Sequence, residues 1–157
     1  MKTKADFYDD PWFNYEEYWD SREYENKAGK IALKRLLKKI PQRKRGKIVD
    51  IGGGYGRLCP LYVSKFDECL LIDPSKKLIK KAKNKNNFSN INFKQGQAEK
   101  IPCPDSTFDV ALLVRVAHHL KDFNSAMEEI WRVLKPGGYL ILEYANKTHL
   151  KSRILNL

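Results

Sequence analysis

Short apolar runs alternate with longer, mostly polar stretches along the 157-residue chain. Runs rich in Val, Ile and Leu, with few polar interruptions, are typical of strands that are buried on both faces of a parallel sheet. Five such runs predict five strands. They cover residues 48–51, 69–73, 91–94, 108–114 and 139–144.

The stretches between these runs have the period of helices. Leucines and isoleucines between positions 33 and 40 recur every three or four residues, which predicts a helix over residues 28–39 with one buried face. Similar patterns predict three more helices, over residues 57–65, over residues 75–83 and after Asp122. Strands that alternate with helices indicate an α/β fold, in which a mainly parallel sheet lies between two layers of helices.

Four glycines fall within residues 52–56, directly after the first predicted strand. Glycine lets the backbone adopt positive φ and approach a ligand without a Cβ in between. A strand, a glycine-rich turn and a helix therefore favour nucleotide binding. The NAD fingerprint would require a glycine at position 57, which is Arg57. The pattern here is instead an acid, Asp50, followed by glycines at alternate positions.

The second predicted strand ends on Asp73, shortly before the next predicted helix. An acid at this position accepts hydrogen bonds from both ribose hydroxyls in dinucleotide-binding folds. The alternative is a carboxylate that only ends the strand or caps the helix. Because Asp73 follows a glycine turn, we favour ribose binding.

The net charge of +11 is unevenly distributed. Residues 27–47 contain ten lysines and arginines and no acid, whereas residues 1–26 contain three basic and eight acidic residues. Such a basic run is either a nucleic-acid-binding surface or the solvated face of a helix. We favour the solvated face, because the run leads to the amino end of the first strand and ligands in open α/β sheets bind beyond the carboxyl ends.

Composition argues against several classes of protein. No apolar run approaches the roughly 20 residues that a membrane helix needs, and no apolar stretch of a signal peptide follows the N-terminal lysines. Cys59, Cys69 and Cys103 are far apart, which is typical of reduced thiols rather than of a disulfide framework or a zinc site. We therefore expect a cytoplasmic protein without a membrane segment or a metal.

Four features, in this order, resemble the class I S-adenosylmethionine (SAM) dependent methyltransferases. The first two are the acid-and-glycine turn and Asp73. Residues 96–109 resemble the Gly-Asp-Ala-Glu loop of that family, with Gln97 in place of the acid, and residues 132–138 resemble its Lys-Pro-Gly-Gly turn. The closest resemblance is to the ubiquinone/menaquinone biosynthesis methylases, which act on small molecules.

The resemblance implies a Rossmann-like three-layer sandwich with strand order 3-2-1-4-5 and SAM as the cofactor. The family's sheet has seven strands, so its final two would be missing here. The resemblance also implies that Gln97 and the backbone of Ala98 contact adenine. We name no catalytic residue and no metal ligand. The cofactor-binding residues that we predict are Asp50, Gly52, Gly53, Gly54, Tyr55, Asp73, Pro74, Gln97, Ala98 and Arg115.

We divide the chain into a helical N-terminal segment (1–45), a SAM-binding core (46–144) and a helical tail (145–157). The fifth strand would have no partner along its outer edge, and an open apolar edge promotes pairing with another chain. The chain is therefore expected either to form a homodimer through this side or to be a fragment of a longer protein.

Aromatic residues are concentrated in the N-terminal segment. Trp12, Tyr15 and Trp19 would share one face of a helix. This face either packs against the core or covers the cofactor as a lid, because aromatic rings suit a sulfonium cation. In the second case, Arg22 or Tyr24 would reach the carboxylate of the cofactor.

The predicted function is methyl transfer from SAM to a small-molecule acceptor that the sequence does not identify. Displacement at an activated sulfonium mainly requires alignment and exclusion of water, so it needs no metal. His118 and His119 follow the fourth strand and either supply a general base or orient the turn. Two alternatives remain: a SAM-binding module without transferase activity, and a methyltransferase that acts on RNA.

Overall fold

The computed structural model describes residues 8–10, 12 and 14–144 of the chain. Five parallel strands form one sheet in the order β3-β2-β1-β4-β5, so the predicted Rossmann-like α/β fold and its strand order are confirmed. The strands are β1 (Lys47–Ile51), β2 (Glu68–Asp73), β3 (Ile91–Gln95), β4 (Phe108–Val114) and β5 (Leu134–Glu143). The described residues contain no strand after β5.

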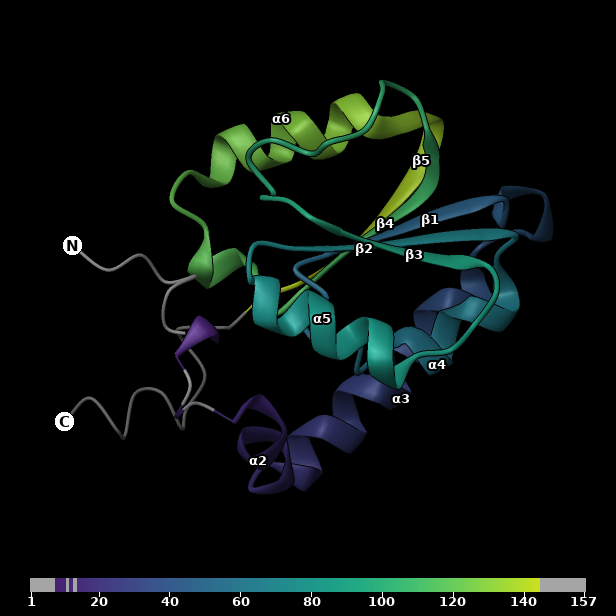
Figure 1. The fold of residues 1–157 in the computed structure, drawn as a ribbon. Coiled ribbons are helices and arrows are strands. Elements are labelled where there is room, and N and C mark those ends of the chain that lie inside the picture. Colours follow the sequence, from purple (N-terminus) through teal and green to yellow (C-terminus); the bar gives the residue numbers. More distant parts are fainter. Residues whose placement is uncertain (1–7, 11, 13, 145–157) are drawn as a thin grey trace, which may run out of the picture.

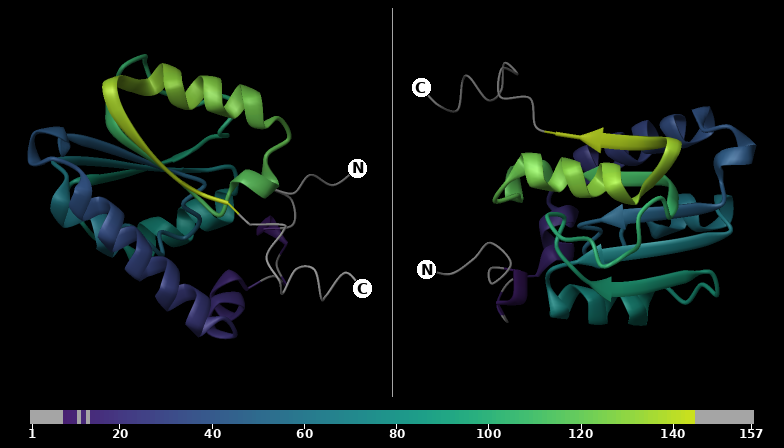
Figure 2. Two further views of the ribbon diagram at one scale, coloured as in Figure 1. Left: turned by 180° about the vertical axis from the view of Figure 1, so that it is seen from behind. Right: turned by 90° about the horizontal axis from the view of Figure 1, so that it is seen from above.

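Helices cover both faces of this sheet (Figures 1 and 2). They are α2 (Tyr15–Asp20), α3 (Glu23–Lys39), α4 (Cys59–Tyr62), α5 (Lys76–Lys85) and α6 (Phe123–Val133), with 3₁₀ turns η1 (Gln42–Lys44), η2 (Val63–Lys65) and η3 (Ala117–His119). The helices α3, α4 and α5 lie on one face and α6 lies on the other, which gives three layers.

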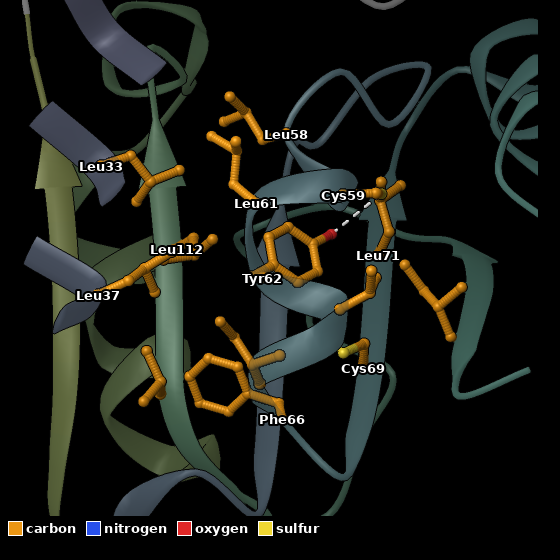
Figure 3. Packing of buried hydrophobic residues seen from close by; sticks show 14 of the residues in the cluster. Leu33, Leu37, Leu58, Cys59, Leu61, Tyr62, Phe66, Cys69, Leu71 and Leu112 are labelled. Atoms are coloured by element: carbon orange, nitrogen blue, oxygen red, sulfur yellow. Dashed lines mark hydrogen bonds between the residues drawn. The ribbon is translucent and has the colours of Figure 1, made fainter. Parts of the chain in front are cut away.

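The two faces of the sheet bury separate hydrophobic clusters. Ile48 belongs to the cluster beneath α3 and α4, together with Leu37 and Tyr62 (Figure 3). The next residue, Val49, belongs to the cluster beneath α6, together with Ile130. Successive side chains of a strand point to opposite faces. A strand that is covered on both faces therefore has apolar residues at successive positions.

Polar side chains cap the first turns of α5 and α6. The Ser75 hydroxyl accepts a hydrogen bond from the Leu78 N–H at 3.0 Å, at the start of α5. At the start of α6, the Asp122 carboxylate accepts from the N–H groups of Asn124 and Ser125. These caps satisfy amide groups that have no partner within their helix.

The helix expected over residues 57–65 is shorter than predicted. It begins only at Cys59 and changes to the 3₁₀ turn η2 after Tyr62. The cause is local, because turn geometry continues as far as Leu58 and Pro60 is tolerated only in the first turn of a helix.

The strand β5 is longer than predicted, since it begins at Leu134 and not at Tyr139. Leu134 pairs with Phe108, and the ladder is irregular before it resumes at Tyr139. The Pro-Gly turn expected at residues 135–138 therefore lies within the strand, at this irregularity. Gly137 has a φ of +68°, as the third position of a type II turn requires.

The predicted aromatic face of the N-terminal segment is wrong at Trp12. Asn14 caps α2, which begins at Tyr15, so Trp12 precedes the helix and is 94% exposed. Trp19 is 3% exposed and packs with Tyr55 in a small cluster of its own. A spacing of three or four residues places side chains on one face only inside a helix, and this helix starts later than the pattern suggests.

Some expectations fall outside what the structure describes. The tail predicted over residues 145–157 is not among the described residues. None of the described helices has the length and apolar character needed to cross a bilayer. Nor does the described part of the chain bring together three His, Cys, Asp or Glu side chains that would hold a metal ion.

Candidate functional site

A cavity of about 320 Å³ opens beside the carboxyl ends of β1, β2 and β4. Ligands in open α/β sheets bind at this edge. Of the ten predicted cofactor-binding residues, six line the cavity. They are Gly52, Asp73, Pro74, Gln97, Ala98 and Arg115. The other four, Asp50, Gly53, Gly54 and Tyr55, do not line it, although all four belong to β1 or to the turn that follows β1.

The turn after β1 has a backbone that glycine adopts most readily. Gly52, Gly54 and Gly56 have φ values of +70°, +58° and +79°, which explains why glycines occupy alternate positions. At Gly53 the obstacle is steric, because a Cβ would lie 2.6 Å from Cγ of Leu71. The fold itself therefore requires all four glycines. Gly52 is the glycine of this turn that reaches the cavity.

Asp73 connects the end of β2 to the glycine turn. It is only 6% exposed, and its Oδ2 accepts a hydrogen bond from the Gly54 N–H at 2.9 Å, while its Oδ1 accepts from the Ser75 N–H at 2.9 Å. Burial raises the pKa of the Asp73 carboxyl to about 6, although these two N–H groups act to lower it. Each carboxylate oxygen retains a lone pair that a ligand hydroxyl can use.

Asp50 lies deeper than Asp73. It is 1% exposed, and its Oδ2 accepts a hydrogen bond from the Tyr62 hydroxyl at 3.1 Å. Burial raises the pKa of the Asp50 carboxyl to about 7, despite the hydrogen bond from Tyr62 and the charge of Arg57, which lower it. The same Oδ2 would be 2.8 Å from a Cβ at Gly53. Asp50 thus supports the glycine turn from behind and does not contact the cavity.

The loop after β3 forms another wall of the cavity. Gln97 and Ala98 line it, as does Gly96, which the sequence analysis did not select. A Cβ at Gly96 would lie 3.0 Å from Cδ of Pro102, so this glycine permits the loop to pack tightly. Leu78 and Val116 add apolar surface. The cavity therefore combines apolar contact with a few polar groups, as small-molecule sites generally do.

Arg115 connects three elements at the carboxyl edge. Its Nε donates to Oε1 of Glu143 at 2.8 Å, and its Nη1 lies 3.3 Å from Oε2 of Glu25. These contacts join the end of β4 to β5 and to α3. Arg115 also has a φ of +60°, which is uncommon for a residue with a side chain. Its place in the cavity wall is thus fixed by two carboxylates from other elements.

Arg22 and Tyr24, the residues expected to reach a ligand carboxylate, do not line the cavity. Arg22 lies 3.4 Å from Glu25 and stacks over the Tyr18 ring. Tyr24 is 85% exposed. The residues with permanently basic side chains that line the cavity are instead Arg115 and Lys121.

The described residues from 8 to 20, which are part of the predicted segment 1–45 and are called the N-terminal segment from here on, form the remaining wall. Tyr8 and Tyr15 line the cavity together with His119. The Tyr8 hydroxyl lies 2.9 Å from Nε2 of His119. His118 is not among the lining residues, and its ring lies against that of His119 with 3.9 Å between centroids. Of the two histidines, only His119 is positioned to contact a ligand.

Comparison with known proteins accounts for this arrangement. Residues 49–142 match the family described as the methyltransferase domain. The chain belongs to the class I SAM-dependent methyltransferases. Membership of this family implies S-adenosylmethionine as the methyl donor.

Individual methyltransferases show how far the likeness extends. An uncharacterized methyltransferase of Bacillus subtilis is 32% identical over 110 residues, which are 68% of this chain and 44% of that protein. A ubiquinone/menaquinone biosynthesis C-methyltransferase of Pectobacterium atrosepticum is 34% identical over 111 residues, 66% of this chain and 44% of that protein. The chain therefore spans less than half the length of these curated methyltransferases.

Solved structures extend the comparison to the N-terminal helices. A SAM-dependent methyltransferase of Thermotoga maritima superimposes with a TM-score of 0.74 at 29% identity, covering 90% of this chain and 62% of that one. A Bacillus subtilis protein superimposes with a TM-score of 0.67 at 30% identity, covering 81% and 56%.

Proposed function

We propose that this chain binds SAM in the cavity at the carboxyl edge and serves transfer of its methyl group to a small-molecule acceptor. One observation supports the proposal above the others. Gly52, Asp73 and the loop at Gln97 meet in one cavity, and they are the parts of the sequence that resemble the family's donor site.

The polar groups of the cavity suit the nucleoside part of SAM. Asp73 would accept hydrogen bonds from ribose hydroxyls through its free lone pairs. The side-chain carbonyl of Gln97 would accept from the adenine amino group, and the Ala98 N–H would donate to a ring nitrogen. Leu78 and Val116 offer apolar contact to the ring. Pro74 lies on the same wall as Asp73.

The remaining predicted residues would act less directly. Asp50, Gly53, Gly54 and Tyr55 would shape the turn rather than contact the ligand. Arg115 already engages two carboxylates, but a guanidinium has five N–H donors. Arg115 would therefore bind an anionic group of the ligand through the donors that remain.

Bound SAM supplies a methyl group on a positively charged sulfur. The chain then has to hold the donor in one orientation and exclude water, because alignment accounts for much of the barrier reduction in such displacements. Tyr8 and Tyr15 line the side of the cavity formed by the N-terminal segment, and aromatic faces attract a cation. We propose that this segment is a lid and that His119, the one of the two described histidines that lines the cavity, is placed to accept a proton.

Ligand-dependent thermal unfolding tests the donor assignment. SAM or S-adenosylhomocysteine at about 100 times its Kd should stabilise the chain by about 2.7 kcal/mol, whereas NAD should leave the melting temperature unchanged. Equal stabilisation by NAD, or none by either SAM compound, would contradict the proposal.

Turnover separates the proposed enzyme from a binding module. Labelled SAM and a panel of small-molecule acceptors should give a methylated product. Stabilisation by SAM without transfer to any acceptor would favour the module without transferase activity. The RNA-directed alternative depends on the basic residues of another surface of the molecule and not on the cavity.

A further inference from the structure

The helical layer formed by α3, α4 and α5 carries most of the positive charge of the helices. The helices α3 and α5 contain twelve lysines and arginines and only two acids. On the opposite face of the sheet, α6 contains one arginine and two glutamates. Figure 1 shows α3, α4 and α5 together on one side of the sheet. The charge asymmetry of the sequence is therefore an asymmetry between the two faces of the fold.

A groove of about 330 Å³ runs along this layer between α3 and the α4–η2 segment. Cations come from both of its sides. We call them the groove cations: Lys34, Arg35 and Lys38 from α3, and Lys65 from η2. No acidic side chain lines the groove. Lys65 is half-buried, whereas the three cations of α3 are exposed.

The groove cations lack counter-charges within the part of the chain that the structure describes. Other lysines of the same layer are paired: Lys81 lies 2.7 Å from Glu16, and Lys27 lies 2.6 Å from Glu23. None of the groove cations forms an ion pair or a side-chain hydrogen bond with a described residue. In the same helix, burial, followed by the nearby charges of Arg57 and Lys34, lowers the pKa of Lys30.

We infer that this groove binds the phosphodiester backbone of a nucleic acid. Uncompensated cations that face one another across a concave surface attract a polyanion, and bound phosphates would relieve their mutual repulsion. Lys34 and Lys38 are one helical turn apart, about 6 Å along the axis. Along the axis of a duplex each strand carries one charge per about 3.4 Å, so the spacing of these two lysines is of the same order as that of backbone phosphates.

The shape of the site argues against two other polyanions. A flat anionic membrane would contact the exposed ridge of α3, but it would not reach the half-buried Lys65 across the groove. An acidic peptide has single carboxylates at irregular intervals. A guanidinium such as that of Arg35 instead matches the paired oxygens of a phosphate. Binding of anionic vesicles or of an acidic peptide instead of nucleic acid would support these alternatives.

The groove shares no lining residue with the cavity at the carboxyl edge. Nucleic-acid binding therefore does not rest on the proposed methyl transfer, and either proposal can fail without the other. The basic run leads to the amino end of β1, which favoured a solvated face in the sequence. This position separates the run from the carboxyl edge, but it leaves a second surface open to a ligand.

The test measures binding of labelled nucleic acid by fluorescence anisotropy at a series of salt concentrations. Probes are a short RNA duplex, a single-stranded RNA and a DNA duplex, with vesicles of phosphatidylcholine and phosphatidylserine as the membrane arm and polyglutamate as the peptide arm. The groove variant replaces all four groove cations by Gln. The control variant removes four exposed charges outside the groove, through Lys76→Gln, Lys80→Gln, Lys83→Gln and Lys94→Gln.

The wild-type chain should bind nucleic acid less tightly as salt rises. The groove variant should bind at least about tenfold more weakly, and its slope of log K against log salt should be smaller in magnitude by about 3. The control variant should lose less than about threefold. A third variant, with Lys34→Arg, Lys38→Arg and Lys65→Arg, keeps the charges and should bind like the wild type. The nucleic acid bound most tightly identifies the source of the phosphates.

Equal losses in the groove and control variants would contradict the proposal, because they would show a general positive field and no site. Weak binding by the arginine variant would also contradict it. Groove-dependent binding of vesicles or polyglutamate without binding of nucleic acid would replace it by a membrane or peptide site. Circular dichroism of each variant verifies that the chain is folded.

Discussion

Two walls of the same cavity are built in different ways. The glycine turn is part of the core, and its shape is set by three positive φ values and by the contact of Gly53 with Leu71. The N-terminal segment lies on the other side and is held largely by side-chain contacts. The Tyr8 hydroxyl lies 2.9 Å from His119, and Glu16 pairs with Lys81 and Lys85.

These two kinds of wall differ in the energy needed to move them. Ion pairs at the surface contribute about 0–1 kcal/mol each, and Glu16 is only half-buried. We therefore expect the part of the N-terminal segment that precedes the buried Trp19 to open locally while the sheet remains folded. Moving the glycine turn would break the buried hydrogen bond from the Gly54 N–H to Asp73. A ligand that is enclosed after it binds requires a rigid surface to bind to and a segment that opens and closes over it. We propose these roles for the glycine turn and the N-terminal segment.

The largest effect is expected at the rigid wall. Gly52 has a φ of +70°, and a Cβ there would lie 2.5 Å from Cγ2 of Val116. Gly52→Ala should lower the free energy of unfolding by about 2–5 kcal/mol through backbone strain and overpacking. Chemical denaturation measures this loss, and the variant should also fail to bind SAM.

Gly29 provides a matched control for that substitution. It lies inside α3, and the nearest atom to an added Cβ outside the backbone of the helix would be a Glu143 carboxylate oxygen at 3.9 Å. Gly29→Ala should therefore raise the free energy of unfolding by about 0.5–1 kcal/mol. Losses of similar size at both positions would show that the geometry of the turn is not special.

The second effect concerns the acids behind the rigid wall. Burial raises the pKa of Asp50 to about 7 and that of Asp73 to about 6, from a model-compound value of 3.8. The folded state therefore retains protons that the unfolded state releases. The free energy of unfolding should fall as the pH rises from about 4 to about 7, by an amount on the order of a few kcal/mol.

Asp50→Asn separates the two acids. The amide oxygen still accepts from the Tyr62 hydroxyl, but it does not ionise. In urea titrations the decline of the variant should follow the ionisation of Asp73, which is half complete near pH 6, whereas the wild type should continue to decline through pH about 7 as Asp50 ionises. Identical pH profiles would show that Asp50 does not ionise in this range.

The smallest effect is expected at the wall that the N-terminal segment forms. Tyr8→Phe deletes the hydroxyl that contacts His119 and should cost about 0.5–1.5 kcal/mol of local closure, with little change in global unfolding. Hydrogen exchange should quicken in the N-terminal segment and not in β1. Tyr24→Phe is the control, because Tyr24 is 85% exposed. Faster exchange in β1 as well would show that the segment and the sheet open together.

The difference between the walls also explains what could be predicted from the sequence. The strands, the glycine turn and the place of Asp73 at the end of β2 follow from short-range patterns, because positive φ and continuous apolar runs leave local traces in the sequence. The strand order follows instead from the resemblance to the family. The pairing of Tyr8 with His119 spans 111 positions and leaves no such trace. The contacts of Arg115 with Glu25 and Glu143 also depend on the packing of distant elements.

The sequence does contain signals for two features that were predicted wrongly or missed, the start of α2 and the place of Gly96 at the cavity. Asn14 is a favourable N-cap residue, and it marks the start of α2 after Trp12 and before Tyr15. Gly96 begins the loop after β3, where an isolated glycine often indicates close approach of other atoms. In contrast, the placement of Asp50 behind the turn could not be predicted, because alternate residues of a doubly covered strand are equally buried.

The most direct test of the account is calorimetric titration of SAM into the wild-type chain and into Asp73→Asn across pH about 5 to 8. The wild type should bind more weakly as pH falls below about 6, because protonation of Asp73 removes its charged acceptor. The variant should bind more weakly by about 2–3 kcal/mol at neutral pH and show no such pH dependence. Equal affinity and equal pH dependence in a folded variant would contradict the assignment of Asp73, and with it the proposed SAM site.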